Sequence, residues 1–302
     1  MDRPVAISAL HLDKWQDVVW TSSMTSSPLR HRHLNPPDLT GAVNQETCVF
    51  LINQLLSLPR EFATTAATPF MHHKLYEKGL PPLLHELKRL CTLHSTTQDP
   101  IPFHQALQTT TTRLLTTTST IHTFSSTLTL VQALLLLQIL TLFNFHLPPP
   151  LRRASEQRIP LLRHWTQKLY LSAPAALPGA FSAYRAWIVA ESVRRTILVS
   201  HKVEGIYAML KEGVFAHTLF VEALPFASRN DWWGAAGGGD AEPDGACVIP
   251  SEEPLGPVGL TDLVSYREFR DAWVRGEIRE LGLFEQLLIA TCLGVEAVKL
   301  RH

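Results

Sequence analysis

The sequence has no excess of charge of either sign. Its 302 residues include 27 Lys and Arg and 27 Asp and Glu, for a formal net charge of +0. Proteins that hold a nucleic-acid backbone usually carry a basic excess or a basic stripe. No acidic or basic run marks either end of the chain. The balance therefore predicts no direct binding of nucleic acid.

Cysteines are few and far apart, at Cys48, Cys91, Cys247 and Cys292. Zinc sites and dithiol redox sites use closely spaced cysteines, so we predict no metal and no cofactor. Scattered thiols are typical of a reducing compartment, and the first residues lack the apolar core of a signal peptide. The expected location is nuclear or cytoplasmic.

Motifs of enzyme chemistry are also missing. The sequence has no G-x-S-x-G turn around a nucleophile, no phosphate-binding glycine loop and no H-E-x-x-H helix. The fourteen histidines do not form such a pattern. No catalytic residue can therefore be named, and the sequence leaves open whether the protein is an enzyme.

Residues 114–151 contain no Asp, Glu, Lys or Arg, and residues 128–147 are rich in leucine. A membrane span needs about 20 predominantly apolar residues. Here Gln132, Gln138 and several threonines interrupt the run. This pattern favours a buried core helix, and we expect no contact with a membrane.

Apolar residues recur at helical spacing along most of the chain, and no long stretch alternates with a period of two. The sequence therefore predicts an all-α fold, a single large helical domain of about ten helices. Its domain would span residues 44–302, after a weakly structured segment, 1–43. A long flexible loop is expected at 234–259, where glycines and prolines cluster. Pro59 is expected to end the first helix.

A tract rich in Thr and Ser, residues 109–129, is poor in helix formers. Its apolar residues nevertheless recur every seven positions, at Leu107, Leu114, Ile121, Leu128 and Leu135. We give this periodicity more weight than propensity. The tract therefore predicts one long helix or two nearly abutting ones, with 128–143 at the centre of the fold.

The most informative segment places one carboxylate and two guanidiniums inside an apolar helix. In W187-I-V-A-E191-S-V-R194-R195-T196, Glu191 is three and four residues ahead of Arg194 and Arg195. Such spacings bring side chains together on a helix, and charges near a buried face need partners. We predict a structural ion pair between Glu191 and one of these arginines, next to Trp187.

These residues resemble the W-x3-E-S-x-R-R-T signature of the regulatory (middle homology) domain of fungal zinc-cluster transcription factors. Further segments are similar to landmarks of the same domain and follow in the same order: 58–62, 69–72, 83–93, 131–138 and 224–225 ahead of 231–233. The resemblance covers roughly residues 45–300. It implies a helical domain that regulates transcription.

The sequence departs from the family at its N-terminal side. Family members carry six cysteines in a basic cluster that holds two zinc ions, whereas no cysteine precedes Cys48. The resemblance then implies a regulatory or interaction protein without its own DNA-binding domain, tied to fungal secondary metabolism. It would act with a protein partner or as a homodimer.

An alternative is that the same helical fold serves as a biosynthetic cyclase or isomerase, for example a pericyclase. Such an enzyme would confine a hydrophobic terpenoid or polyketide intermediate and needs no nucleophile motif. Both functions suit an internal apolar cavity for a small hydrophobic ligand, with Thr141, Ser200, His201 and Tyr207 as polar contacts; a solid core built from the same residues is the competing expectation. Near the C-terminus, Glu285 and Glu296 are expected on a solvated face.

Overall fold

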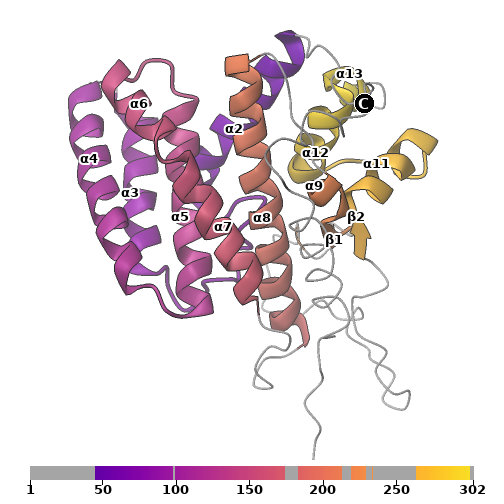
Figure 1. The fold of residues 1–302 in the computed structure, drawn as a ribbon, viewed down its shortest axis with the longest axis horizontal. Helices are drawn as coiled ribbons and strands as arrows, with labels where there is room; N and C mark the ends of the chain where they lie inside the picture. The colour runs from indigo at the N-terminus through magenta and orange to yellow at the C-terminus, as the bar shows by residue number, and fades with distance from the viewer. Residues whose placement is uncertain are drawn as a thin grey trace, which may run out of the picture.

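The computed structural model describes residues 45–97, 99–173, 183–212, 219–228, 233 and 263–299. The predicted weakly structured segment 1–43 and the predicted loop 234–259 lie outside these residues. The described chain is all-α, which confirms the predicted fold class; its single sheet has two strands of three residues each. The helices form a bundle, and a smaller layer of C-terminal elements packs against one side of it (Figure 1).

The bundle consists of seven helices among the described residues. In chain order these are α2 (Gln45–Thr65), α3 (Pro82–Thr96), α4 (Pro100–Thr117), α5 (Phe124–Leu142), α6 (Pro149–Glu156), α7 (Ile159–Ser172) and α8 (Ala183–Glu212). Helix α8 has 30 residues, which corresponds to a length of about 45 Å. It lies between the rest of the bundle and the C-terminal layer (Figure 1).

Helix α5 is the core of the bundle. Every residue from Thr127 to Leu142 is buried, and α5 contacts α2, α3, α4, α6, α7 and α8. By length and composition α5 could cross a membrane, but 89% of its most apolar window is buried inside the fold. It is therefore a core helix, as its glutamines and threonines indicated.

The Thr-rich tract forms two nearly abutting helices, one of the two predicted outcomes. Helix α4 ends at Thr117, a 3-10 turn follows (Thr118–Thr120), and α5 begins at Phe124. The break is sharp because Thr123 caps α5: its hydroxyl accepts from the N–H of Ser126, whose side chain bonds back to the N–H of Thr123. This reciprocal pair satisfies two N–H groups that a helix start leaves free.

The expectation that Pro59 ends the first helix is wrong. Helix α2 continues through Pro59 to Thr65. A proline inside a helix removes one hydrogen bond and crowds the preceding turn. Here Pro59 itself is buried, as are Leu55, Leu58 and Phe62 before and after it in the helix, so tertiary packing outweighs the local cost.

The C-terminal layer contains α9 (Leu219–Ala223), β1 (Pro225–Ala227), β2 (Leu263–Ser265), α11 (Tyr266–Arg275), α12 (Leu283–Leu293) and α13 (Val295–Lys299). The two strands are antiparallel, with Phe226 opposite Val264. β1 and α12 both contact α8, and α12 and α13 contact α2. The C-terminal elements thus rest on the same two helices of the bundle.

Candidate functional site: a buried charge network on helix α8

Glu191 lies at the boundary between the bundle and the C-terminal layer. Its carboxylate accepts from Nε of Arg194 at 2.8 Å and from Nε of Arg195 at 2.9 Å. The backbone N–H of Ala227 in β1 donates to both carboxylate oxygens at 3.1 Å. Since Glu191 is fully buried, these contacts replace the water that it loses on folding. They also fasten β1 to α8.

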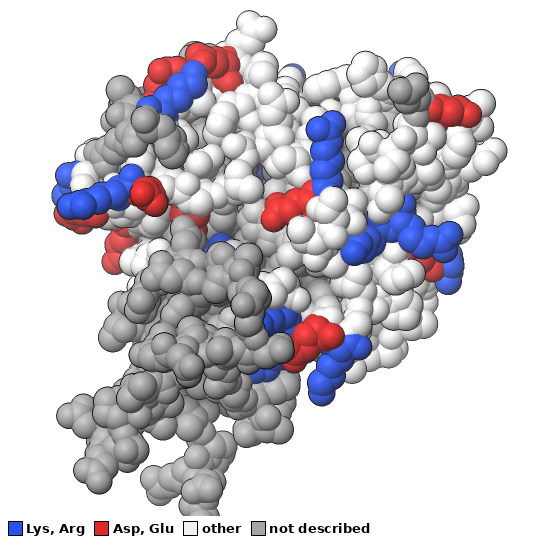
Figure 2. Space-filling view, turned by 180° about the vertical axis from the view of Figure 1, so that it is seen from behind, with Lys and Arg blue, Asp and Glu red and all other residues white. Residues whose placement is uncertain are grey.

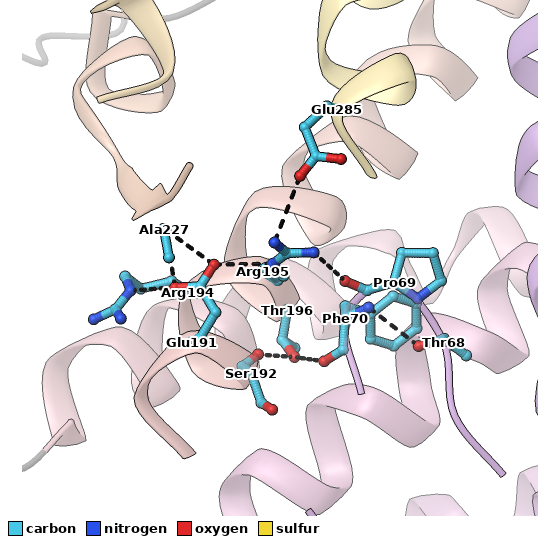
Figure 3. A network of polar contacts seen from close by, with 10 residues as sticks. All are labelled: Thr68, Pro69, Phe70, Glu191, Ser192, Arg194, Arg195, Thr196, Ala227 and Glu285. Atoms are coloured by element: carbon cyan, nitrogen blue, oxygen red, sulfur yellow. Dashed lines mark hydrogen bonds and ion pairs between the residues drawn. The ribbon is translucent and has the colours of Figure 1, made fainter. Parts of the chain in front are cut away.

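Arg195 extends the network toward two further segments. Its guanidinium lies 3.5 Å from the carboxylate of Glu285 in α12 and 3.5 Å from the carbonyl of Pro69, in the loop after α2 (Figure 3). Its central carbon is 4.2 Å from the ring centroid of Trp233 and 4.4 Å from that of Phe284. A buried guanidinium suits this position, because its flat fork binds acids and carbonyls at its edge and aromatic rings at its face.

The network contains two carboxylates, Glu191 and Glu285, and two guanidiniums, Arg194 and Arg195, so its formal charges balance. Arg194 is half-buried, whereas Glu191, Arg195 and Glu285 are buried. Trp187 is buried one turn earlier, where its ring lies parallel to that of Tyr184. The structure thus brings together Glu191, Arg194 and Arg195 and places Trp187 beside them.

A second row of hydrogen bonds joins α8 to α5. The hydroxyl of Thr196 donates to the carbonyl of Ser192 at 2.6 Å and receives a bond from the side-chain amide of Gln132 at 3.2 Å. Gln132 in turn accepts from the hydroxyl of Tyr76 at 2.6 Å. Gln132, one of the polar residues that interrupt the apolar run of α5, therefore connects this helix to α8 and to the loop after α2.

The expectation that Glu285 occupies a solvated face is wrong. Its side chain is 2% exposed and faces Arg195, whereas that of Glu296 is 62% exposed. Glu285 belongs to α12, in which seven of the eleven residues are buried, and sequence reasoning missed it. The high apolar content of α12 was the available signal, since a lone acid in such a helix needs a basic partner.

Three of the four residues predicted to orient a ligand donate their hydroxyls to groups within the fold. Thr141 and Ser200 donate their hydroxyls to carbonyls of their own helices, at Leu137 and Thr196. The hydroxyl of Tyr207 donates to the carboxylate of Glu156 in α6. Burial lowers the pKa of His201 to about 4, so its imidazole is neutral at pH 7 and packs against Phe220.

A second buried polar group, which the sequence did not reveal, surrounds Lys202. Its ammonium nitrogen lies 4.1 Å from the ring centroid of Tyr266, and Glu222 and Cys292 are close enough to act on its charge. Burial lowers the pKa of Lys202 to about 7, against the opposing effect of these two groups. A lysine with such a pKa can act as a base or nucleophile, but this one is 1% exposed and lies under α11.

The surface shows no continuous basic area on the face drawn in Figure 2, where Lys and Arg lie beside Asp and Glu in small groups. Among the described residues, no three His, Cys, Asp or Glu side chains are placed to hold a metal ion. A shallow depression of about 380 Å³ follows α7 and is lined by His164, Gln167, Lys168, Leu171 and Ser172. It includes none of the predicted site residues.

Comparison with known proteins agrees with the resemblance that residues 187–196 of α8 carry. Over 179 aligned residues the chain is 27% identical to "Transcription factor gsfR2" of Penicillium aethiopicum, across 54% of this chain and 43% of that protein. The chain is similar to a transcription factor. It spans less than half the length of this relative. No protein-family model matches the chain, and no solved structure matches it significantly.

Proposed function

We propose that the chain is a regulatory and interaction domain of the kind found in fungal zinc-cluster transcription factors, and that it works in the nucleus. The observation that carries this proposal is the buried network of α8. Its four charged groups engage one another and backbone groups of the loop after α2 and of β1. They join the bundle to the C-terminal layer, so these charges stabilise the arrangement of the two layers. The similarity to a named transcription factor supports this assignment.

The finer parts of the proposal concern partners. The 302 residues carry no six-cysteine cluster, so we propose that the chain reaches DNA only through a different protein as partner, in the regulation of fungal secondary metabolism. A homodimer of the chain would need the same partner. A small hydrophobic ligand could set the state of such a domain by binding one arrangement of the two layers more tightly than another.

A reporter experiment tests the regulatory role. The whole chain is fused to an unrelated DNA-binding domain in a filamentous fungus, and expression of a reporter gene carrying its binding site is measured. We expect expression to change relative to the DNA-binding domain alone. The change should disappear with Glu191→Ala and persist with Glu296→Ala, whose exposed side chain lies outside the network. A fusion that leaves the reporter at the level of the DNA-binding domain alone contradicts the proposal.

Ligand addition separates the regulatory role from the alternative of a cyclase or isomerase. Terpenoid and polyketide intermediates are incubated with the protein while melting temperature and product mass are followed. Stabilisation without turnover supports a sensing domain. A new isomer of unchanged mass, formed with the protein but not in its absence, supports the enzyme.

A further inference from the structure

Helix α6 contains a sequence that protein kinases recognise. Residues 151–155 read Leu-Arg-Arg-Ala-Ser, so Ser155 follows two arginines at the third and second preceding positions. Basophilic serine/threonine kinases select this pattern, because acidic side chains in their substrate clefts pair with the guanidiniums. Arg153 is exposed and Arg152 is half-buried, so both are near the surface of the folded protein.

The acceptor hydroxyl is closed off in the folded state. Ser155 is fully buried. Its hydroxyl donates to the carbonyl of Leu151 at 3.0 Å and accepts from Nη2 of Arg158 at 2.8 Å. The backbone carbonyl of Ser155 accepts from the side chain of Gln138 in α5 at 3.0 Å. A kinase can reach this oxygen only when α6 leaves α5.

The structure holds α6 weakly in this position. Ser155 is the one buried residue among the eight of α6, all of which are described, and Leu151 is the one hydrophobic residue of α6 that packs, partly buried, against the core. Little apolar area therefore fixes the helix. Beside it, Nε of Arg158 and Oε1 of Gln138 are buried without a hydrogen-bond partner. When α6 opens, both atoms can form hydrogen bonds with water. The closed state lacks these bonds and is less stable for that reason. Such elements open locally while the rest of a domain stays folded.

We propose that Ser155 is a phosphorylation site for a basophilic serine/threonine kinase, which modifies α6 in its open form and thereby keeps it away from α5. ATP is the co-substrate. The Ser155 oxygen forms a bond to the γ-phosphorus, the bond from that phosphorus to the oxygen bridging it to the β-phosphate breaks, and ADP leaves. The hydroxyl proton passes to a carboxylate of the kinase and then to solvent.

Closing is prevented by charge and size. A phosphoserine carries a charge of about −1.5 to −2 near neutral pH, and the closed site is fully buried against Gln138. Burying that charge costs far more than the few polar contacts of α6 return. In the open form Arg152, Arg153 and Arg158 lie within three residues of the phosphate along the chain and can pair with it. This inference goes beyond the proposed function, since it adds a covalent input to the bundle.

The test uses the whole 302-residue chain with the catalytic subunit of a cAMP-dependent protein kinase and Mg-ATP. Phosphate at Ser155 is measured by mass spectrometry over time, with a free peptide of residues 148–159 as the open reference. We expect slow modification of the whole chain and fast modification of the peptide. Tyr207→Phe removes the hydroxyl bond to Glu156 and should speed the whole-chain reaction roughly five- to tenfold. Ser155→Ala is the control for modification at other sites.

Three results would overturn the proposal. One is a peptide that the kinase does not modify; another is a whole chain that stays unmodified at Ser155, even with Tyr207→Phe, while the peptide reacts. The third concerns opening: the backbone N–H groups of α6 should exchange with deuterium faster in the phosphorylated chain than in the unmodified one. Equal rates would show that the phosphate leaves α6 in place. None of these results depends on the reporter experiment, so the two proposals fail separately.

Discussion

The guanidinium of Arg195 lies 3.5 Å from the carboxylate of Glu285, a residue 90 positions further along the chain. This contact joins α8 to α12 at the boundary between the bundle and the C-terminal layer. Neither side chain is more than 2% exposed. Water cannot solvate a charge at this depth, so each of these two side chains needs an oppositely charged partner.

Glu285→Ala should therefore destabilise the protein clearly, by about 2 kcal/mol or more, because Arg195 keeps its charge and loses a partner. Unfolding in urea gives the free energy. Glu296→Ala is the matched control, since the same change is made at a 62% exposed carboxylate in the next helix and should leave stability nearly unchanged. Equal losses for the two variants would contradict the buried contact.

Glu191→Ala should cost more, about 3–5 kcal/mol, because two arginines and the N–H of Ala227 lose their acceptor together. For a domain of this size the melting temperature should fall by roughly 10 °C. Glu277→Ala removes an acid from an exposed pair with Arg275 and should barely change melting. If Glu191→Ala melts like the parent and yet abolishes an activity, the residue acts in chemistry and not in architecture.

Lys202 should make stability depend on pH. Its pKa is about 7 in the folded protein and 10.5 in the reference state, so unfolding takes up a proton between these values. The contribution of Lys202 to the free energy of unfolding is therefore lowest below pH 7, and it rises with pH between the two pKa values. Lys202→Met keeps the volume and removes the titration. The stability advantage of this variant over the parent should shrink by up to about 2 kcal/mol between about pH 6.5 and about pH 8.5. A constant difference would show that Lys202 does not titrate there.

The 302-residue chain should bind neither zinc nor DNA tightly. It has a formal net charge of +0, and the described residues offer no cluster that could hold a metal. Metal analysis of the purified chain and a gel-shift assay at moderate salt measure these properties. Stoichiometric zinc, or sequence-specific retardation without a partner protein, would be the contrary result.

Much of the fold could be predicted, because periodicity along one chain segment determines which side of a helix is buried. The seven-residue spacing from Leu107 to Leu135 correctly outweighed the poor helix propensity of the threonines. The spacing did not show whether the helix is interrupted before α5, because the interruption depends on the hydrogen bonds between Thr123 and Ser126. Pro59 was misread because the contacts that keep α2 continuous come from buried neighbours.

Less of the site could be predicted. Glu191, Arg194 and Arg195 are near in sequence, so helical spacing was enough to place them together. Glu285, Trp233 and Ala227 reach the same point from distant segments, and no local pattern specifies such contacts. Lys202 was hidden for the same reason, because its burial depends on Tyr266 of α11.

The pairing of β1 with β2 has a consequence for how the chain tolerates change in length. Ala227 and Leu263 are register partners, so two residues 36 positions apart in the chain are held side by side. When the number of residues between two fixed points of a chain doubles, the entropic cost of loop closure rises by only about 0.6 kcal/mol. Trp233 packs on Arg195, so an insertion is best placed after it. A fluorescent tag inserted between positions 234 and 262 should therefore leave the layers on either side of α8 in place, which the melting temperature of the tagged protein checks.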